Sequence, residues 1–156
     1  MSIALTLQQY LADHRIDYDV VPHAPTATSM RTAEASHVPG DCLAKAVLLK
    51  EDSGYLLAVL PASHHLDLDD LETRLDRPLE LASEQEIGRL FGDCALGAVP
   101  AIGAAYGLEV IVDDRIASQP EIYFEGGDHA TLVHMSGAQF ARLTSGAAHG
   151  VFSQHA

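Results

Sequence analysis

A lysine inside an apolar segment is the first residue that suggests chemistry. Lys45 stands in Cys42-Leu43-Ala44-Lys45-Ala46-Val47, where an ammonium group is costly unless it has a partner or a function. Such a lysine can hold a phosphate or polarise a carbonyl group. Alternatively, it lies at a strand edge and extends its charged end to water. The segment alone leaves both interpretations open.

A second candidate is an uncharged loop of small residues that contains one proline. It reads Leu96-Gly97-Ala98-Val99-Pro100-Ala101-Ile102-Gly103. Small residues let backbone amides and carbonyls approach a ligand, and proline holds such a loop rigid. The loop lacks the Lys-Ser/Thr ending of a phosphate-binding loop and the GxGxxG spacing. An ordinary turn is therefore the alternative.

Two acidic turns complete the candidates. Gly126-Gly127-Asp128-His129 joins two expected strands, and a histidine there can donate to a carbonyl, transfer protons or orient a terminal ribose. Asp113-Asp114 follows another expected strand and offers carboxylates for catalysis or ribose binding. A surface hairpin and a plain turn are the respective alternatives.

The sequence contains no pattern that indicates a metal site, a serine nucleophile or a reactive cysteine pair. His64-His65 followed by Asp67, Asp69 and Asp70 matches no known metal-binding spacing, so we expect a solvated helix N-terminus and no metal. A GxSxG serine motif is missing from the sequence. Cys42 and Cys94 form no CxxC pair and are expected to be idle thiols.

The elements that must position these residues follow from periodicity and turn signals. Thr6 is a candidate N-cap, and Ser83 with Glu86 forms a capping-box pattern. Helices are expected at 5–14, 32–36, 67–75, 83–91 and 136–143. Strands are expected at 18–21, 44–50, 55–60, 79–81, 108–112, 121–124 and 131–133, with 44–50 and 55–60 as an antiparallel hairpin. This order predicts one α+β domain over residues 1–156, with helices around a mixed, largely antiparallel sheet.

Bulk composition limits the partners. The 156 residues are 47% hydrophobic, and 22 acidic against 9 basic side chains give a formal net charge of -13. This charge opposes sequence-independent binding along a phosphate backbone, so DNA is not an expected partner. No apolar run approaches the roughly 20 residues of a membrane helix, and the first residues do not resemble a signal peptide. We expect a soluble, cytoplasmic protein.

Taken in order, five motifs resemble the YbaK and prolyl-tRNA synthetase editing-domain family. They are His23-Ala24-Pro25, Lys45 at the start of a strand, Gly97 to Gly103, Val112-Asp113, and Gly127-Asp128-His129. Each motif is weak alone, but five in this order are a stronger signal, and the resemblance extends from about residue 5 to residue 145.

The resemblance implies hydrolysis of the ester bond that attaches a wrong, small amino acid to a transfer RNA. The tRNA for proline is the expected carrier. It implies catalytic roles for Lys45, Gly97 and His129. It implies substrate contacts by His23, Ala98, Val99, Pro100, Ala101, Gly103 and Asp113. The partner is the 3′-terminal aminoacyl end of tRNA, with a synthetase as a further candidate. The family uses the substrate's own ribose hydroxyl for proton handling, so no cofactor is implied.

One departure from the family pattern concerns the loop. Its proline usually stands two residues before the closing glycine, where this chain has Ala101, and the proline here is Pro100. This bears on amino-acid specificity more than on fold. Two alternatives remain: a non-catalytic binding module of the same fold, and an unrelated α+β enzyme that pairs Asp128 or Asp113 with His129.

Overall fold

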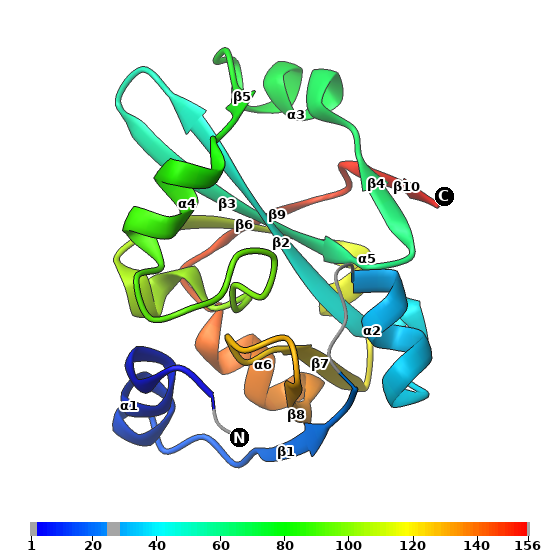
Figure 1. Cartoon of the computed structure of the whole chain (residues 1–156). Helices are drawn as coiled ribbons and strands as arrows, with labels where there is room; N and C mark the ends of the chain where they lie inside the picture. Colours follow the sequence, from blue (N-terminus) through cyan, green and yellow to red (C-terminus); the bar gives the residue numbers. More distant parts are fainter. Residues whose placement is uncertain (1–2, 25–28, 156) are drawn as a thin grey trace.

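A long hairpin forms the centre of the molecule. The computed structural model describes residues 3–24 and 29–155. In it, β2 (Leu43–Glu51) and β3 (Gly54–Pro61) pair antiparallel, with Lys45 opposite Leu60. Most of β3 is buried, and the two strands cross the molecule diagonally in Figure 1. The predicted hairpin is confirmed.

The remaining strands extend this hairpin into a mixed sheet. In the described residues, the order is β1-β8-β7-β2-β3-β6-β9, and β5 also pairs with β2. The strands β7–β2, β3–β6 and β6–β9 run parallel, and the other pairs are antiparallel. The bounds are β1 Asp19–Pro22, β5 Glu80–Leu81, β6 Glu109–Asp113, β7 Glu121–Glu125, β8 Thr131–Ser136 and β9 Ala148–Gly150. A separate antiparallel pair joins β4 (His64–Leu66) to β10 (Ser153–His155). The single α+β domain with a mixed sheet is confirmed.

The sheet is split next to β2. Strand β7 pairs with β2 only at Leu43 and Ala44, and β5 pairs with it only at Leu49 and Lys50. Among the described strands, none therefore pairs with the intervening edge of β2, from Lys45 to Val47. An opening in a sheet leaves room for a ligand beside backbone groups.

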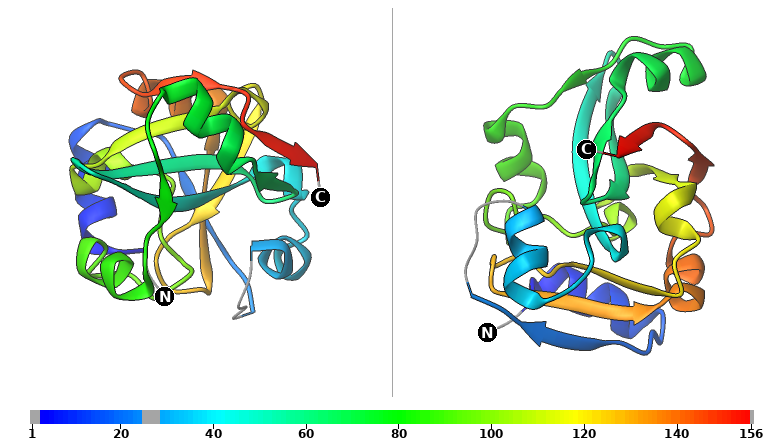
Figure 2. Two further views of the ribbon diagram at one scale, coloured as in Figure 1. Left: turned by 90° about the horizontal axis from the view of Figure 1, so that it is seen from above. Right: turned by 90° about the vertical axis from the view of Figure 1, so that its right-hand side faces the viewer.

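Helices surround the sheet, as Figures 1 and 2 show. They are α1 Leu5–Asp13, α2 Ser29–Ser36, α3 Leu68–Leu75, α4 Glu84–Leu90, α5 Asp114–Ala117 and α6 Gly137–Leu143, with 3-10 turns η1 Gly40–Cys42 and η2 Gly103–Tyr106. No helix in these described parts of the chain is long and apolar enough to cross a membrane. The predicted loop from His23 to Ser29 falls largely on residues 25–28, and Pro25 thus lies outside the described residues.

Capping side chains fix several helix starts. Ser83 and Glu86 form the predicted capping box of α4. The predicted N-cap role of Thr6 is wrong, because the N-cap is Ala4 and the Thr6 amide instead donates to the Asp93 carboxylate over 2.9 Å. A distant carboxylate thus replaces the local cap.

The predicted solvated helix start at His64-His65 is also wrong for the histidines. They belong to β4, and His64 is only 8% exposed. Its Nδ1 lies 3.1 Å from the hydroxyl of Ser153 on β10. The helix begins after them, with Asp67 as its N-cap.

Side chains of β2 alternate between two core clusters. Leu48 joins the main cluster and Leu49 a second one on the other face, as the period of a strand requires. The main cluster includes Leu7, Leu11, Phe91, Phe124 and Phe140; the second includes Leu56, Leu71 and Phe152. A third cluster packs Ala33 of α2 on Leu43 and Leu132. The hairpin thus connects all three clusters.

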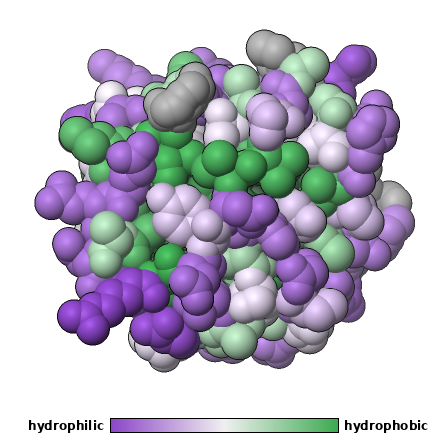
Figure 3. All heavy atoms as spheres, turned by 90° about the horizontal axis from the view of Figure 1, so that it is seen from below, coloured by the Kyte–Doolittle hydropathy of each residue, from purple (hydrophilic) through white to green (hydrophobic). Residues whose placement is uncertain are grey.

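The face seen from below carries an apolar band among hydrophilic residues (Figure 3). Leu5, Tyr18 and Val20 are exposed apolar side chains of α1, β1 and the segment between them. Strand β1 is an edge of the sheet. It is short, starts with Asp19 and ends with Pro22, which are features that discourage pairing with another chain.

Candidate active site

A small cavity opens at the split in the sheet. Its volume is about 90 Å³, and it is lined by Leu43, Ala44, Lys45, Ala46, Leu48, Ile87, Gly97, Val99 and Glu125. The structure therefore brings Lys45 and Gly97 to one cavity. Val99 of the loop also lines this cavity. Its sequence neighbours Ala98 and Pro100 are buried and do not line it.

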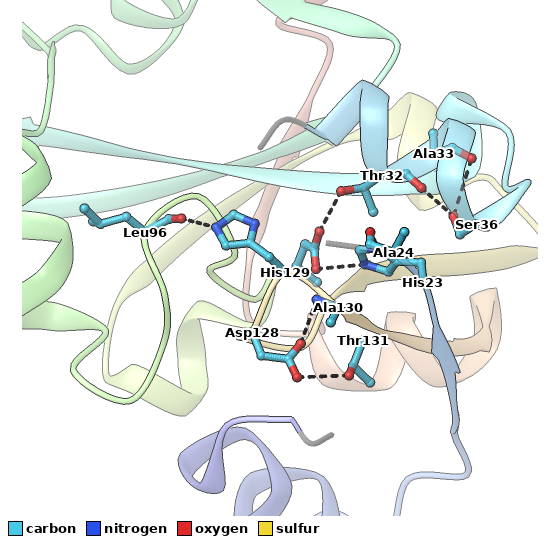
Figure 4. A network of polar contacts seen from close by, with 11 residues as sticks. His23, Ala24, Thr32, Ala33, Ser36, Leu96, Asp128, His129, Ala130 and Thr131 are labelled. Atoms are coloured by element: carbon cyan, nitrogen blue, oxygen red, sulfur yellow. Dashed lines mark hydrogen bonds and ion pairs between the residues drawn. The ribbon is translucent and has the colours of Figure 1, made fainter. Parts of the chain in front are cut away.

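The loop that contains Gly97 is fastened to the β7–β8 turn at two points. The Ala95 amide donates to the Gly127 carbonyl over 2.7 Å. The His129 Nε2 contacts the Leu96 carbonyl oxygen. A carbonyl only accepts, so Nε2 must carry the proton and donate. His129 does not line the cavity. Its contact with Leu96, drawn in Figure 4, joins it to the residue that precedes Gly97.

Two residues of this arrangement have left-handed backbones. Gly97 has φ 82° and His129 has φ 62°. Glycine adopts this region freely, whereas for histidine it is uncommon and costs energy. The surrounding contacts therefore hold His129 in a strained position, as often occurs at functional sites.

The Lys45 ammonium group has a definite partner. Its Nζ donates to the His64 carbonyl over 2.5 Å, and the side chain is partly buried. Burial lowers the pKa of Lys45, because desolvation disfavours the charged form. The bond to His64 directs the ammonium group toward β4.

Glu125 is a cavity residue that the sequence reasoning missed. It ends β7 and is only 6% exposed. Its Oε2 accepts from the Thr32 hydroxyl over 2.8 Å, and its Oε1 lies 3.5 Å from His23 Nε2. In Figure 4, dashed lines lead from the labelled His23 and Thr32 to one unlabelled carboxylate, which these two contacts identify as that of Glu125. Of the residues expected to bind substrate, His23 is thus placed beside a cavity residue.

Electrostatics make Glu125 unusual among the acidic residues. Burial raises its pKa, and the hydrogen bond from Thr32 with the nearby His23 and His129 only partly offsets this. A buried carboxyl group with a raised pKa is suited to carry a proton. The only sequence signal was its position at the end of a strand before two glycines.

The second half of the loop faces a different space. Ala101 and Gly103 line a larger cavity of about 300 Å³, with Tyr10, His14 and Arg142 on its other walls. The loop therefore separates two cavities. The structure does not bring Ala101 and Gly103 to the cavity that Lys45 lines.

Asp113 is occupied by structural contacts. Its side chain is fully buried and accepts from the Arg115 amide over 2.8 Å, the Phe152 amide over 3.0 Å and the Ser153 hydroxyl over 2.7 Å. It caps α5 and holds the final strand in place. Asp113 does not line the Lys45 cavity.

Neither thiol is suited to nucleophilic chemistry. Burial, with the acidic Asp41 and Glu121, raises the pKa of Cys42. Burial raises the pKa of Cys94 to about 11. Because the thiolate is the reactive form, both side chains stay protonated near neutral pH.

The sequence matches the family model described as the aminoacyl-tRNA editing domain over residues 23–143. The matched range contains Lys45, the Gly97 loop, Glu125 and His129. Among curated proteins, none matches.

Several solved structures share this fold. A hypothetical protein is 20% identical, with a TM-score of 0.84, and the match covers 96% of this chain and 99% of that one. A "putative trans-editing enzyme for prolyl tRNA synthetase" is 24% identical, with a TM-score of 0.81 and coverage of 96% and 95%. A "putative signal transduction protein" from Marinobacter aquaeolei is 26% identical, with a TM-score of 0.80, but the match covers 97% of this chain and only 31% of that one.

Proposed function

Because the chain belongs to the aminoacyl-tRNA editing domain family, we propose that it is an aminoacyl-tRNA deacylase. It would hydrolyse the ester bond between a wrongly attached amino acid and the 3′ end of a transfer RNA. One observation carries this proposal: Lys45 and Gly97, distant in sequence, line one cavity at the split in the sheet. A lysine whose pKa is lowered and a glutamate whose pKa is raised meet at this cavity, and ionisable groups with shifted pKa values cluster at functional sites.

The chemistry requires little of the protein. An aminoacyl ester is already activated, so the site need only orient water and stabilise the developing oxyanion. We assign the Gly97 backbone to the reacting carbonyl and Lys45 to an anionic or carbonyl oxygen. His129 would hold the loop and the substrate end in position. His23, Ala98, Val99 and Pro100 would shape the site around the substrate.

The size of the cavity favours a small amino acid. About 90 Å³ is well below the roughly 300 to 1,000 Å³ that is typical of pockets for drug-sized ligands. Ile87 and Val99 in its lining would exclude larger side chains. Transfer RNA for proline is the carrier we propose, in line with the family resemblance.

The charge of the chain limits the contact with RNA. With a formal net charge of -13, few phosphates can be neutralised, so we propose that only the single-stranded 3′ end enters the site. Binding should be weak and sensitive to salt. A synthetase would then deliver the RNA in the cytoplasm, where transfer RNA is charged.

A deacylation assay tests this function. The purified 156-residue protein is mixed with tRNA for proline that carries alanine, cysteine, serine or proline, and release of each amino acid is followed under single-turnover conditions. We expect hydrolysis of one small non-cognate ester and survival of the prolyl ester. Absence of hydrolysis across a broad panel of mischarged tRNAs would favour the non-catalytic binding module instead.

A further inference from the structure

The contacts of His23 and Glu125 determine how many protons they hold. His23 Nδ1 lies 2.7 Å from the Ala24 carbonyl oxygen, which only accepts, so Nδ1 carries a proton. The other nitrogen, Nε2, faces Glu125 Oε1 at 3.5 Å. Two lone pairs would repel each other there. One proton therefore belongs between these atoms, on the carboxyl group or on the imidazole.

Both atoms are withdrawn from water and incompletely satisfied. Within residues 3–24 and 29–155, His23 Nε2 and Glu125 Oε1 are buried side-chain atoms that find no hydrogen-bond partner, and the His23 side chain is 0% exposed. Buried polar atoms without hydrogen bonds are costly and call for an explanation. Glu125 also lines the cavity of Lys45 and Gly97, so this incompletely satisfied pair lies at the cavity wall.

We infer that Glu125, paired with His23, is the proton-transfer group of this site. The inference rests on the proposed deacylase function and adds a side-chain acid to it. As water attacks the carbonyl carbon, a new carbon–oxygen bond forms and the bond to the ribose oxygen breaks. The pair gives its proton to that ribose oxygen. It recovers one from the attacking water, so the pair ends as it began.

The charged and polar groups around Glu125 come from four elements. They are His23 after β1, Thr32 on α2, His129 in the β7–β8 turn, and Lys45 on β2 in the same cavity. The two histidines favour the ionised carboxylate, and burial opposes ionisation. A raised pKa of this carboxyl group is consistent with proton transfer near neutral pH.

The test compares Glu125→Gln with Glu121→Gln, a control at the exposed start of the same strand. Glutamine keeps the shape and an oxygen for Thr32 but cannot transfer a proton. Single-turnover deacylation is measured from acidic to alkaline pH, with uncatalysed hydrolysis subtracted. We expect Glu125→Gln to lower the maximal single-turnover rate constant by about 10² to 10⁴-fold, with little change in the enzyme concentration that gives half of that maximum. Glu121→Gln should retain the wild-type rate.

The pH profile separates a proton-transfer role from a structural one. The wild-type rate should fall as pH rises through the raised pKa of Glu125, because the ionised carboxylate has no proton to give. This limb should disappear in Glu125→Gln and in His23→Gln, while circular dichroism stays unchanged. A folded Glu125→Gln protein with the wild-type rate and profile would overturn the inference and leave the deacylase function standing. If the wild-type protein hydrolysed none of the mischarged tRNAs, both this inference and the proposed deacylase function would be wrong.

Discussion

The imidazole of His129 donates from Nε2 to the carbonyl oxygen of Leu96, and so joins the β7–β8 turn to the loop that begins at Gly97. A second link, from the Ala95 amide to the Gly127 carbonyl, runs beside it. The loop position therefore depends on a histidine held in a left-handed backbone. This relationship assigns His129 a positioning role and sets the first prediction.

Replacement of His129 by glycine should separate backbone strain from the side-chain link. Glycine accepts φ 62° without cost, so the stability should change by less than about 1 kcal/mol. Loss of one hydrogen bond should lower the deacylation rate about 10-fold. Arg15→Gly is the matched control, because Arg15 also has a positive φ of 52°. Equal rates for wild type and His129→Gly would contradict the positioning role.

Lys45→Ala should lose most deacylation while the fold remains. The side chain is only partly buried and contributes one bond to the His64 carbonyl, so packing losses are small. Removal of one well-placed electrostatic group typically lowers the rate about 10²-fold or more. This loss should exceed that of His129→Gly. Lys50→Ala, at the exposed end of the same strand, is the control in single-turnover assays with circular dichroism.

Gly97→Ala tests the shape of the loop. At φ 82° an alanine costs about 1–2 kcal/mol, and relief of this strain would displace the backbone at the cavity. We expect a comparable loss of stability in Gly107→Ala, which has φ 72° and free space for a methyl group. Only Gly97→Ala should also lower kcat. Parallel activity losses in both variants would argue against a specific role for Gly97.

Asp113→Ala should affect stability and not chemistry. It removes the cap of α5 and the acceptor for Phe152 and Ser153, which we expect to cost about 3 kcal/mol in free energy of unfolding. Asp114→Ala, at the exposed neighbour, should cost far less. Urea unfolding gives the stabilities. A full-rate, destabilised Asp113→Ala protein is expected, and a folded but inactive one would restore the substrate-binding role.

His134 should make a pH-dependent contribution to stability. Burial alone lowers its pKa, but hydrogen bonds to Glu121 and Asp19, both 2.6 Å, outweigh this and raise it. A raised folded-state pKa stabilises the protein below the unfolded value of about 6.5, and this gain disappears as pH rises through the folded value. The difference in unfolding free energy between wild type and His134→Gln should reach at most about 1 kcal/mol at mildly acidic pH. A difference that grows toward alkaline pH would refute the charged form.

Local patterns in the sequence predicted the elements whose signals are local. The apolar segments 44–50 and 55–60 predicted the β2–β3 hairpin, and Ser83 with Glu86 predicted the start of α4. The short strands β4, β9 and β10 escaped prediction. Each has three residues, and two of them pair with each other across the length of the chain. Such pairing depends on tertiary contacts and leaves no periodic signal.

The site residues also differ in whether a local sequence signal marks them. Lys45 was conspicuous because a charge in an apolar strand is locally anomalous. Glu125 was not conspicuous, because an acidic residue before a turn is common on protein surfaces. Only the folded structure shows that α2 and His23 cover it. Asp113 shows the reverse case: a turn carboxylate of ordinary appearance becomes the buried acceptor for residues about 40 positions later. Acidic residues with a structural role and those at the candidate site therefore look alike in the sequence. Only their partners in the folded structure distinguish the two roles.

The split between β2 and β7 has a consequence for how such a domain diversifies. Ile87 and Val99, which border the cavity, belong to a helix and a loop and to no strand. Changing their size alters the space for a substrate without removing any hydrogen bond of the sheet. Both side chains pack only at the partly buried margin of the main core. The shape of this cavity can therefore change in a lineage of these proteins at a smaller cost in stability than a change within the β2–β3 hairpin.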